Sequence, residues 1–344
     1  MAMLPRPIIR RPIMMIIVSL LAIVMTALTP AAMIVLGLTD FITGYRRGRR
    51  VRIWLVLTCV LLNEAVGAVI GLLISVRFLG RSGSQKWLRA NYRLEWWWCR
   101  SHLGAIKRFA NISMEFDNPE VLAPGNAIIV ARHASHVDAL GPLHACDVAG
   151  VQALYTLKQE LQWLPAMDLI ANRTPNVWID RTPRAGSPML GKIEKLAAGI
   201  DETNAGVIFP EGTFFTPARL EKAAARLAST RPELEQKARQ LTKILPPRPA
   251  GFLALLRGSP GADIVLIANV GLENGGGMSE LLAKIDHPTA LRMHAWRYPR
   301  VEVPRDSDDA VAWLLDRWIE MDQWIVDQAA DLDPAPHGDI KEPQ

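Results

Sequence analysis

Two long apolar segments dominate the N-terminal part of the chain. Residues 13–38 contain no charged side chain, and residues 53–76 contain one, Glu64, next to Asn63. At 1.5 Å per residue a helix over the first segment would be about 39 Å long, which exceeds the roughly 30 Å hydrocarbon core of a bilayer. The pattern predicts a pair of membrane-embedded helices, the first of them kinked at Pro30.

The way in which this pair sits in a membrane is left open by its flanking charges. Arginines precede the first segment, separate the two segments and follow the second. A simple spanning hairpin would put one basic cluster on the wrong side. Either both helices dip into one leaflet and return, or only the first one spans, and we interpret Glu64 as a sign of shallow insertion. A cleaved signal peptide is disfavoured, because the first segment is too long and a second one follows it.

From about residue 102 onward, short apolar strands alternate with helical patterns. The helical stretches cover residues 160–171 and 189–200. This alternation predicts an α/β domain with a mainly parallel sheet flanked by helices. The predicted strands are residues 127–131, 153–157, 176–180, 206–210 and 263–270.

The remaining patterns divide the chain. Residues 218–243 are charged and helical with a break near Arg231–Pro232, and residues 308–330 form an amphipathic helix. Trp87 and Trp96–Trp98 alternate with basic residues, which suits either the head-group layer or the core of the first soluble helix. We therefore expect three parts: a membrane-embedded region over residues 1–80, a catalytic domain over residues 81–331 with an insertion at about 218–243, and a disordered tail over residues 332–344.

The net charge and the cysteines indicate where in the cell the protein acts and what kind of surface it binds. The formal net charge is +5, and much of the excess comes from arginines beside the apolar segments. This favours attraction to anionic lipid head groups over binding of nucleic acid, for which no motif is present. Three scattered cysteines indicate a reducing compartment rather than a disulfide framework. The prediction is a protein of the cell inner membrane with its catalytic domain in the cytoplasm.

His133 and Asp138 are the leading candidates for chemistry. They follow a predicted strand at a spacing of five, which neither a helix nor a strand brings together, so they meet only where the chain turns. A base beside a carboxylate at such a corner suits proton transfer. Ser135 with Asp138 also resembles a helix-capping box.

A metal-binding role of His136 is disfavoured, because alanine occupies positions 134 and 139, where the common metallo-hydrolase pattern H-x-H-x-D-H needs histidines. Two further motifs follow predicted strands, where α/β folds build their sites. F-P-E-G-T at 209–213 predicts a tight turn that exposes Glu211, and W-I-D-R at 178–181 ends on Arg181, whose guanidinium suits a phosphate. Taken singly, these are also compatible with an ordinary turn and a surface ion pair.

Taken in order, H-x4-D, an apolar-Ile-Asp-Arg segment and F-P-E-G-T resemble the glycerolipid acyltransferase family, which includes the lysophosphatidic acid acyltransferases. The resemblance runs from about residue 100 to 325. Residues 155–167 are similar to the family's segment after the first motif. Residues 245–256 and 313–322 are similar to the branch that acts on lysophospholipids and lysocardiolipin.

The resemblance implies a membrane-bound O-acyltransferase that moves an acyl chain from acyl-CoA, or from acyl carrier protein, to lysophosphatidic acid or a related lysophospholipid. No cofactor and no metal are expected. His133 would be the general base and Asp138 its orienting partner. The implied substrate-binding residues are Arg181, which would bind the acceptor phosphate, Glu211 and Gly212, which would shape the acceptor pocket, and Thr213, Lys158 and Arg219.

Two positions depart from the family pattern. Arg132 stands where the family usually has Asn before its histidine, and Phe214 stands where it usually has Arg after F-P-E-G-T. Arg219 or Lys222 is a candidate to replace that arginine. The departures keep open a catalytically inactive, membrane-moored lipid-binding protein. A lipid hydrolase that uses Ser135 or Cys146 is a second alternative, although neither residue lies on a recognisable nucleophile elbow.

Overall fold

The computed structural model describes residues 4–44, 47–135, 137–179, 188–272, 285 and 288–332. Its centre is a seven-stranded sheet of order β1-β7-β6-β2-β5-β3-β4. The strands are β1 (Ile112–Phe116), β2 (Ala127–Ala131), β3 (Gln152–Lys158), β4 (Val177–Ile179), β5 (Asn204–Ile208), β6 (Asp263–Val270) and β7 (Thr289–Tyr298). All five predicted strands are present, and β1 and β7 were not predicted.

The sheet is mixed but mostly parallel, as the sequence predicted. β2 lies between β5 and β6 and is parallel to both, and β3 is parallel to β5 and β4. β7 is antiparallel to β6 and carries β1 on its other side in parallel register. The carboxyl ends of β2, β5 and β3 therefore meet at one edge, where the segments that follow them come together.

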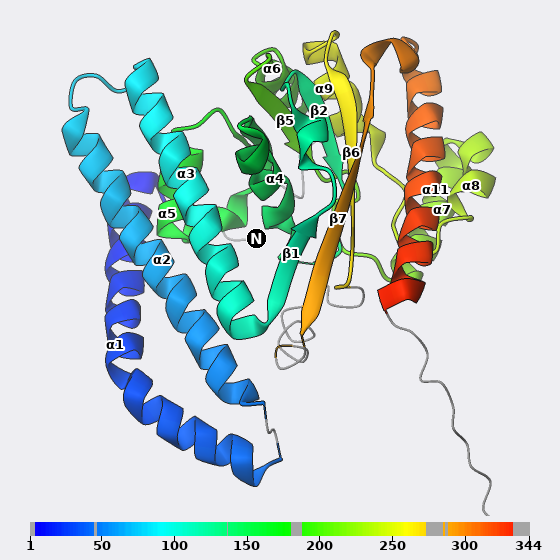
Figure 1. Cartoon of the computed structure of the whole chain (residues 1–344). Coiled ribbons are helices and arrows are strands. Elements are labelled where there is room, and N and C mark those ends of the chain that lie inside the picture. The colour runs from blue at the N-terminus through cyan, green and yellow to red at the C-terminus, as the bar shows by residue number, and fades with distance from the viewer. Residues whose placement is uncertain are drawn as a thin grey trace, which may run out of the picture.

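Helices cover both faces of the sheet (Figure 1). On one face lie α3 (Gln85–Ala105), α4 (Gly141–Ala149) and α5 (Pro165–Ala171), and on the other lie α6 (Met189–Ala197), α9 (Pro249–Gly258) and α11 (Ser307–Leu332). Successive side chains of β2 enter opposite cores: Ile129 packs with the first group and Ile128 with the second. A strand buried on both faces is apolar throughout, which is why AIIVA was readable as a strand.

The predicted helical insertion is present as α7 (Pro217–Thr230) and α8 (Pro232–Ala238), with the break at Arg231. The helix predicted over residues 160–171 is wrong as a single element. A 3₁₀ helix, η4 (Gln159–Trp163), ends before α5 begins at Pro165. Proline lacks an amide N–H and suits the first turn of a helix, so it divides the segment.

The two apolar segments form α1 (Pro7–Ile42) and α2 (Arg49–Arg77), both long and apolar enough to cross a membrane by length and composition. α1 contains Pro30 and bends along its course, and α2 lies between α1 and α3 (Figure 1). We call these two helices the N-terminal hairpin. The predicted boundary near residue 80 falls in the link between α2 and α3.

The middle of α2 packs tightly on the α/β domain. A Cβ atom on Gly67 would lie 2.8 Å from the Cβ of Ala166 in α5, so only glycine permits this approach. Glu64 is buried, and its carboxylate accepts hydrogen bonds from the Trp98 indole at 2.7 Å and from the Ala166 backbone N–H at 3.0 Å. Trp98 is therefore a core residue, which decides between the two interpretations of this tryptophan.

Candidate active site

His133 lies directly after β2, at the edge where the parallel strands end. Its side chain is buried, with 7% of the residue exposed. The imidazole ring lies between two phenylalanines, with its centroid 4.9 Å from that of Phe209 and 4.6 Å from that of Phe214. Both phenylalanines belong to the turn after β5, so the histidine motif and the F-P-E-G-T motif form one site.

Glu211 joins these two motifs through the backbone. One carboxylate oxygen accepts a hydrogen bond from the His133 N–H and the other accepts one from the Leu245 N–H, each at 2.9 Å. The side chain is buried, so these charge-assisted bonds are shielded from water. The structure shows Glu211 fixing the loop that carries His133, and its predicted place in the wall of the acceptor pocket stays a prediction.

Gly212 is required by the shape of the turn. Its φ is +70°, a region that L side chains rarely adopt, and its N–H donates to the Phe209 carbonyl at 3.3 Å. A Cβ atom there would lie 3.0 Å from a terminal nitrogen of Arg248. Arg248 in turn donates its backbone N–H to the Pro210 carbonyl at 3.0 Å, which closes the turn. Thr213 follows in a half-buried position.

Two basic residues reach Phe214, which is one of the two positions that depart from the pattern of the family that the sequence resembles. The ammonium group of Lys158, at the end of β3, lies 5.9 Å from the centre of the Phe214 ring. The Arg219 guanidinium donates to the Phe214 carbonyl at 2.9 Å. The structure thus brings Lys158 and Arg219 to the turn that packs on His133, and their role in substrate binding stays a prediction.

Arg132, the second departure, has a structural role. It is buried, and its guanidinium donates to the carbonyls of Asn269 and Lys243. Its backbone carbonyl accepts a hydrogen bond from the Asn269 side-chain amide at 3.3 Å. Arg132 therefore ties the end of β2 to the end of β6 and to the segment before α9.

Asp138 begins the short 3₁₀ helix η3 (Asp138–Leu140). The N-cap of the following helix α4 is Leu140, without a side-chain hydrogen bond. The side chain of Asp138 lies outside the described residues, as do His136 and Arg181. The pairing of His133 with Asp138 and the phosphate role of Arg181 remain predictions.

A buried polar group in α3 was not predicted. Glu95 in α3 is 4% exposed, and within the described residues its Oε2 has no hydrogen-bond partner. Burial raises the pKa of this carboxyl to about 8. Burial also raises the pKa of the Cys146 thiol, which is fully enclosed. A protonated, inaccessible thiol is a poor nucleophile, which argues against a cysteine hydrolase.

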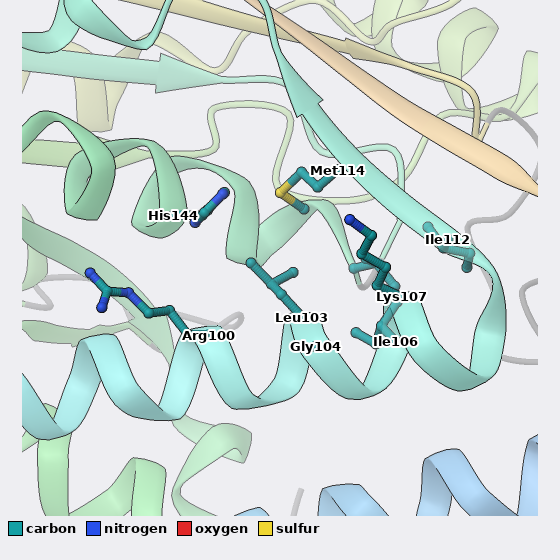
Figure 2. Close-up of a pocket in the computed structure, with 9 residues that line it drawn as sticks. Arg100, Leu103, Gly104, Ile106, Lys107, Ile112, Met114 and His144 are labelled. Atoms are coloured by element: carbon teal, nitrogen blue, oxygen red, sulfur yellow. The ribbon is translucent and has the colours of Figure 1, made fainter.

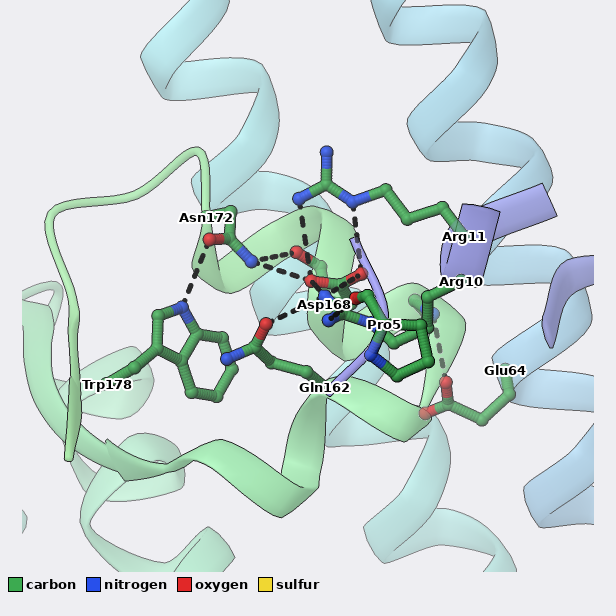
Figure 3. Close-up of polar contacts among 9 residues, drawn as sticks. Pro5, Arg10, Arg11, Glu64, Gln162, Asp168, Asn172 and Trp178 are labelled. Carbon is green, nitrogen blue, oxygen red and sulfur yellow. Dashed lines mark hydrogen bonds and ion pairs between the residues drawn. The ribbon is translucent and has the colours of Figure 1, made fainter. Parts of the chain in front are cut away.

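A network of hydrogen bonds and ion pairs between side chains connects the start of α1 to β4 (Figure 3). Asp168 in α5 accepts hydrogen bonds from the guanidinium groups of Arg10 and Arg11, each at 3.0 Å. Asn172 donates to Asp168 at 2.7 Å and accepts from the Trp178 indole at 3.1 Å. Trp178 belongs to the W-I-D-R motif, so this network of contacts reaches the strand that precedes Arg181 in the sequence.

Comparisons with known proteins found similarities to a family, to a curated protein and to a solved structure. Residues 113–248 match the family model described as Acyltransferase. The chain is 23% identical over 294 residues to lysophosphatidylinositol acyltransferase 10 of Caenorhabditis elegans, covering 82% of this chain and 72% of the relative. Among solved structures, the 1-acyl-sn-glycerophosphate acyltransferase PlsC from Thermotoga maritima matches at 14% identity, with a TM-score of 0.43, over 80% of this chain and 99% of that chain.

Proposed function

We propose that the protein transfers an acyl chain from a thioester to the free hydroxyl of a lysophospholipid, on the premise that residues 113–248 match the Acyltransferase family model. The observation that carries the proposal is the position of His133. It stands at the carboxyl end of β2, inside the matched region, and its loop is fixed to the F-P-E-G-T turn by Glu211.

The reaction needs a base, because an alcohol is a weak nucleophile at neutral pH. The neutral imidazole of His133 takes the proton of the acceptor hydroxyl while that oxygen attacks the thioester carbonyl. The tetrahedral adduct then collapses, the C–S bond breaks, and the imidazolium returns the proton to the departing thiolate. General-base catalysis of this kind contributes about 10²–10⁴ in rate. Asp138 orients the ring and stabilises the imidazolium.

The residues around His133 have separate tasks in this scheme. Phe209 and Phe214 pack against the imidazole and exclude water from it. Lys158 and Arg181 supply positive charge for the acceptor phosphate at the ends of neighbouring strands β3 and β4. Acyl-CoA or acyl carrier protein supplies the thioester.

The N-terminal hairpin holds the domain at the lipid surface. Its outward side chains are large, apolar and exposed, for example Leu20 and Ile34 in α1 and Leu73 in α2. The inward side of α2 is bound to the catalytic domain through Glu64 and Gly67, so α2 stays with that domain along its middle. We therefore place both helices in one leaflet, with basic residues at both ends of α2 among the head groups. The domain then faces the cytoplasm, where acyl thioesters are made.

The rival reading, an inactive lipid-binding protein, relied on Arg132 and Phe214. Arg132 forms hydrogen bonds inside the fold, and Phe214 packs on the His133 ring. In the described part of the chain both residues thus have structural roles, and neither stands in place of a catalytic group. The departures are therefore compatible with an active enzyme.

The deciding experiment uses the full-length protein in phospholipid vesicles. Radiolabelled acyl-CoA and acyl carrier protein are offered in parallel against lysophosphatidic acid and lysophospholipids with different head groups. We expect transfer to at least one acceptor, with loss of more than 95% of it in His133→Ala at an unchanged unfolding temperature. Absence of transfer to every acceptor would favour the binding protein.

A further inference from the structure

A cavity of about 220 Å³ lies between α3, the π-helix η1 (Ile106–Ala110), β1 and α4. Val137, the residue before Asp138, forms part of its wall. Because β1 is antiparallel to β2, the beginning of β1 lies at the same edge of the sheet as the end of β2. The cavity is therefore next to the loop of His133 and Asp138, and we call it the α3–α4 cavity.

Three nitrogen-bearing side chains line the α3–α4 cavity: Arg100, Lys107 and His144 (Figure 2). The Arg100 guanidinium is held in place by two hydrogen bonds to Asp147, at 2.5 and 2.7 Å. Lys107 has no carboxylate partner in the part of the chain that the structure describes, and its side chain is exposed. The cavity thus offers a fixed guanidinium and an ammonium group that is free to bind an anion.

His144 adds a polar group that the fold leaves unused. Its Nδ1 is buried and has no hydrogen-bond partner within the described residues. Burial lowers the pKa of the ring, which is therefore neutral at pH 7 and able to donate one hydrogen bond and accept another. A buried polar atom without a partner costs free energy, and a small shift of the ring toward the cavity would let a ligand hydroxyl satisfy it.

The cavity is large enough for a small group but too small for a long acyl chain, and its basic side chains favour a polar group. At about 30 Å³ per water in the liquid, 220 Å³ corresponds to roughly seven waters. Pockets that enclose drug-sized ligands start at about 300 Å³. The apolar wall formed by Leu103, Ile106 and Met114 suits the carbon skeleton of a polyol, and the basic side chains suit its phosphate.

One wall of the cavity is attached to the N-terminal hairpin. Arg52 of α2 donates to the carbonyl of Phe109 at 3.1 Å, at the end of the same η1 that contributes Ile106 and Lys107. The cavity therefore lies beside the hairpin that we place at the lipid surface, where the lipid-borne acceptor is found and the soluble thioester is not. This contact favours the acceptor over the donor as the source of the phosphate.

We propose that the α3–α4 cavity binds the polar head group of the acceptor, a phosphate ester that carries hydroxyl groups, and thereby sets acceptor specificity. This inference rests on the proposed function and revises one part of it. A lysophospholipid such as lysophosphatidylinositol carries a single phosphate, which binds in this cavity, so Lys158 and Arg181 are left for the phosphates of acyl-CoA. Lys107 and Arg100 bind the phosphate ester, and His144 binds a hydroxyl.

The kinetic test compares Lys107→Ala with Lys192→Ala, a substitution of an exposed lysine on α6 on the other side of the sheet. Lysophosphatidylinositol and lysophosphatidic acid are the acceptors, and acyl-CoA is the donor. Loss of one charge-assisted hydrogen bond predicts a rise of roughly tenfold in acceptor KM, with kcat and the acyl-CoA KM changed less than twofold. Lys192→Ala should behave as the unmodified protein. A rise in the acyl-CoA KM alone would assign the cavity to the donor phosphate and overturn the proposal, as would no change in either KM.

A binding measurement separates this inference from the proposed function. Glycerophosphoinositol is titrated calorimetrically into His133→Ala, and into the same variant carrying Lys107→Ala or His144→Phe. We expect binding that each second substitution weakens at least fivefold, whether or not the unmodified protein transfers an acyl chain. Binding that is insensitive to both substitutions would overturn the cavity assignment even for an active enzyme. If His144→Phe lowers the unfolding temperature, His144→Gln replaces it, because the amide keeps a polar group in the cavity and should retain part of the affinity.

Discussion

The guanidinium of Arg10 lies 3.0 Å from a carboxylate oxygen of Asp168, and the two side chains are only 2% and 1% exposed. Arg11 binds the same carboxylate from a more exposed position. The first turn of α1 is thereby fixed to α5, so α1 and the domain that carries His133 keep one relative orientation.

Asp168→Asn should destabilise the protein strongly. The substitution leaves a buried guanidinium without its counter-charge, which typically costs about 3–5 kcal/mol. The free energy of unfolding, measured by denaturant titration in detergent micelles, should fall by that amount. Asp308→Asn is the matched control, because Asp308 forms an exposed ion pair with Arg231, and such pairs contribute at most about 1 kcal/mol. Equal effects of the two substitutions would contradict the role of Asp168.

Glu211→Gln should impair catalysis by releasing the loop of His133. The amide keeps one acceptor oxygen, so one of the two backbone N–H groups, of His133 or Leu245, loses its bond. We expect kcat/KM to fall roughly 10- to 100-fold, since small displacements of a catalytic base are costly. Steady-state kinetics across acceptors should show the same factor for each. A loss confined to one acceptor would instead assign Glu211 to acceptor recognition.

Gly212→Ala tests the turn after β5. A φ of +70° costs an L residue about 1–2 kcal/mol, and the added Cβ also meets Arg248. Gly150→Ala has a similar φ of +72° with no atom within 4 Å of the added Cβ, so it reports the backbone cost alone. Chemical denaturation should give a lower free energy of unfolding for Gly212→Ala than for Gly150→Ala. Transferase activity should fall only in Gly212→Ala. Equal stability of the two would mean that the Arg248 contact is relieved without cost.

Glu95 predicts a pH dependence of stability. Its pKa is raised by burial from 4.5 to about 8, so between these values the folded protein holds a proton that the unfolded chain has released. Stability from this group is complete below about pH 4.5 and decreases as the pH rises toward 8, with a slope of about 1.4 kcal/mol per pH unit. Glu95→Gln should flatten the curve of unfolding free energy against pH over this window. A curve unchanged by the substitution would show that Glu95 does not carry the effect.

The elements that the sequence predicted are those whose pattern depends on burial alone. The apolar run 263–270 is β6 because both of its faces are covered. β7 was missed because Arg292, His294 and Trp296 alternate with its buried Leu291, Met293 and Ala295, and this mixture does not resemble a buried strand.

The parts of the site that could not be predicted depend on contacts between distant positions. The two backbone partners of Glu211 lie 78 and 34 residues away from it, and nothing local to F-P-E-G-T indicates them. Arg132 was read as a departure from a motif, and its contacts with Asn269 and Lys243 explain it only once β2 and β6 are neighbours.

The close packing of Gly67 against Ala166 has a practical consequence for handling the protein. A shortened chain that starts after α2 would lay bare the surface of α3 and α5, with the Trp98 indole and the Ala166 amide deprived of their acceptor on Glu64. Such a fragment should aggregate. A detergent-free form is better sought by exchanging outward leucines and isoleucines of α1 for glutamate and lysine, which leaves the inner helix in place as a structural part of the enzyme.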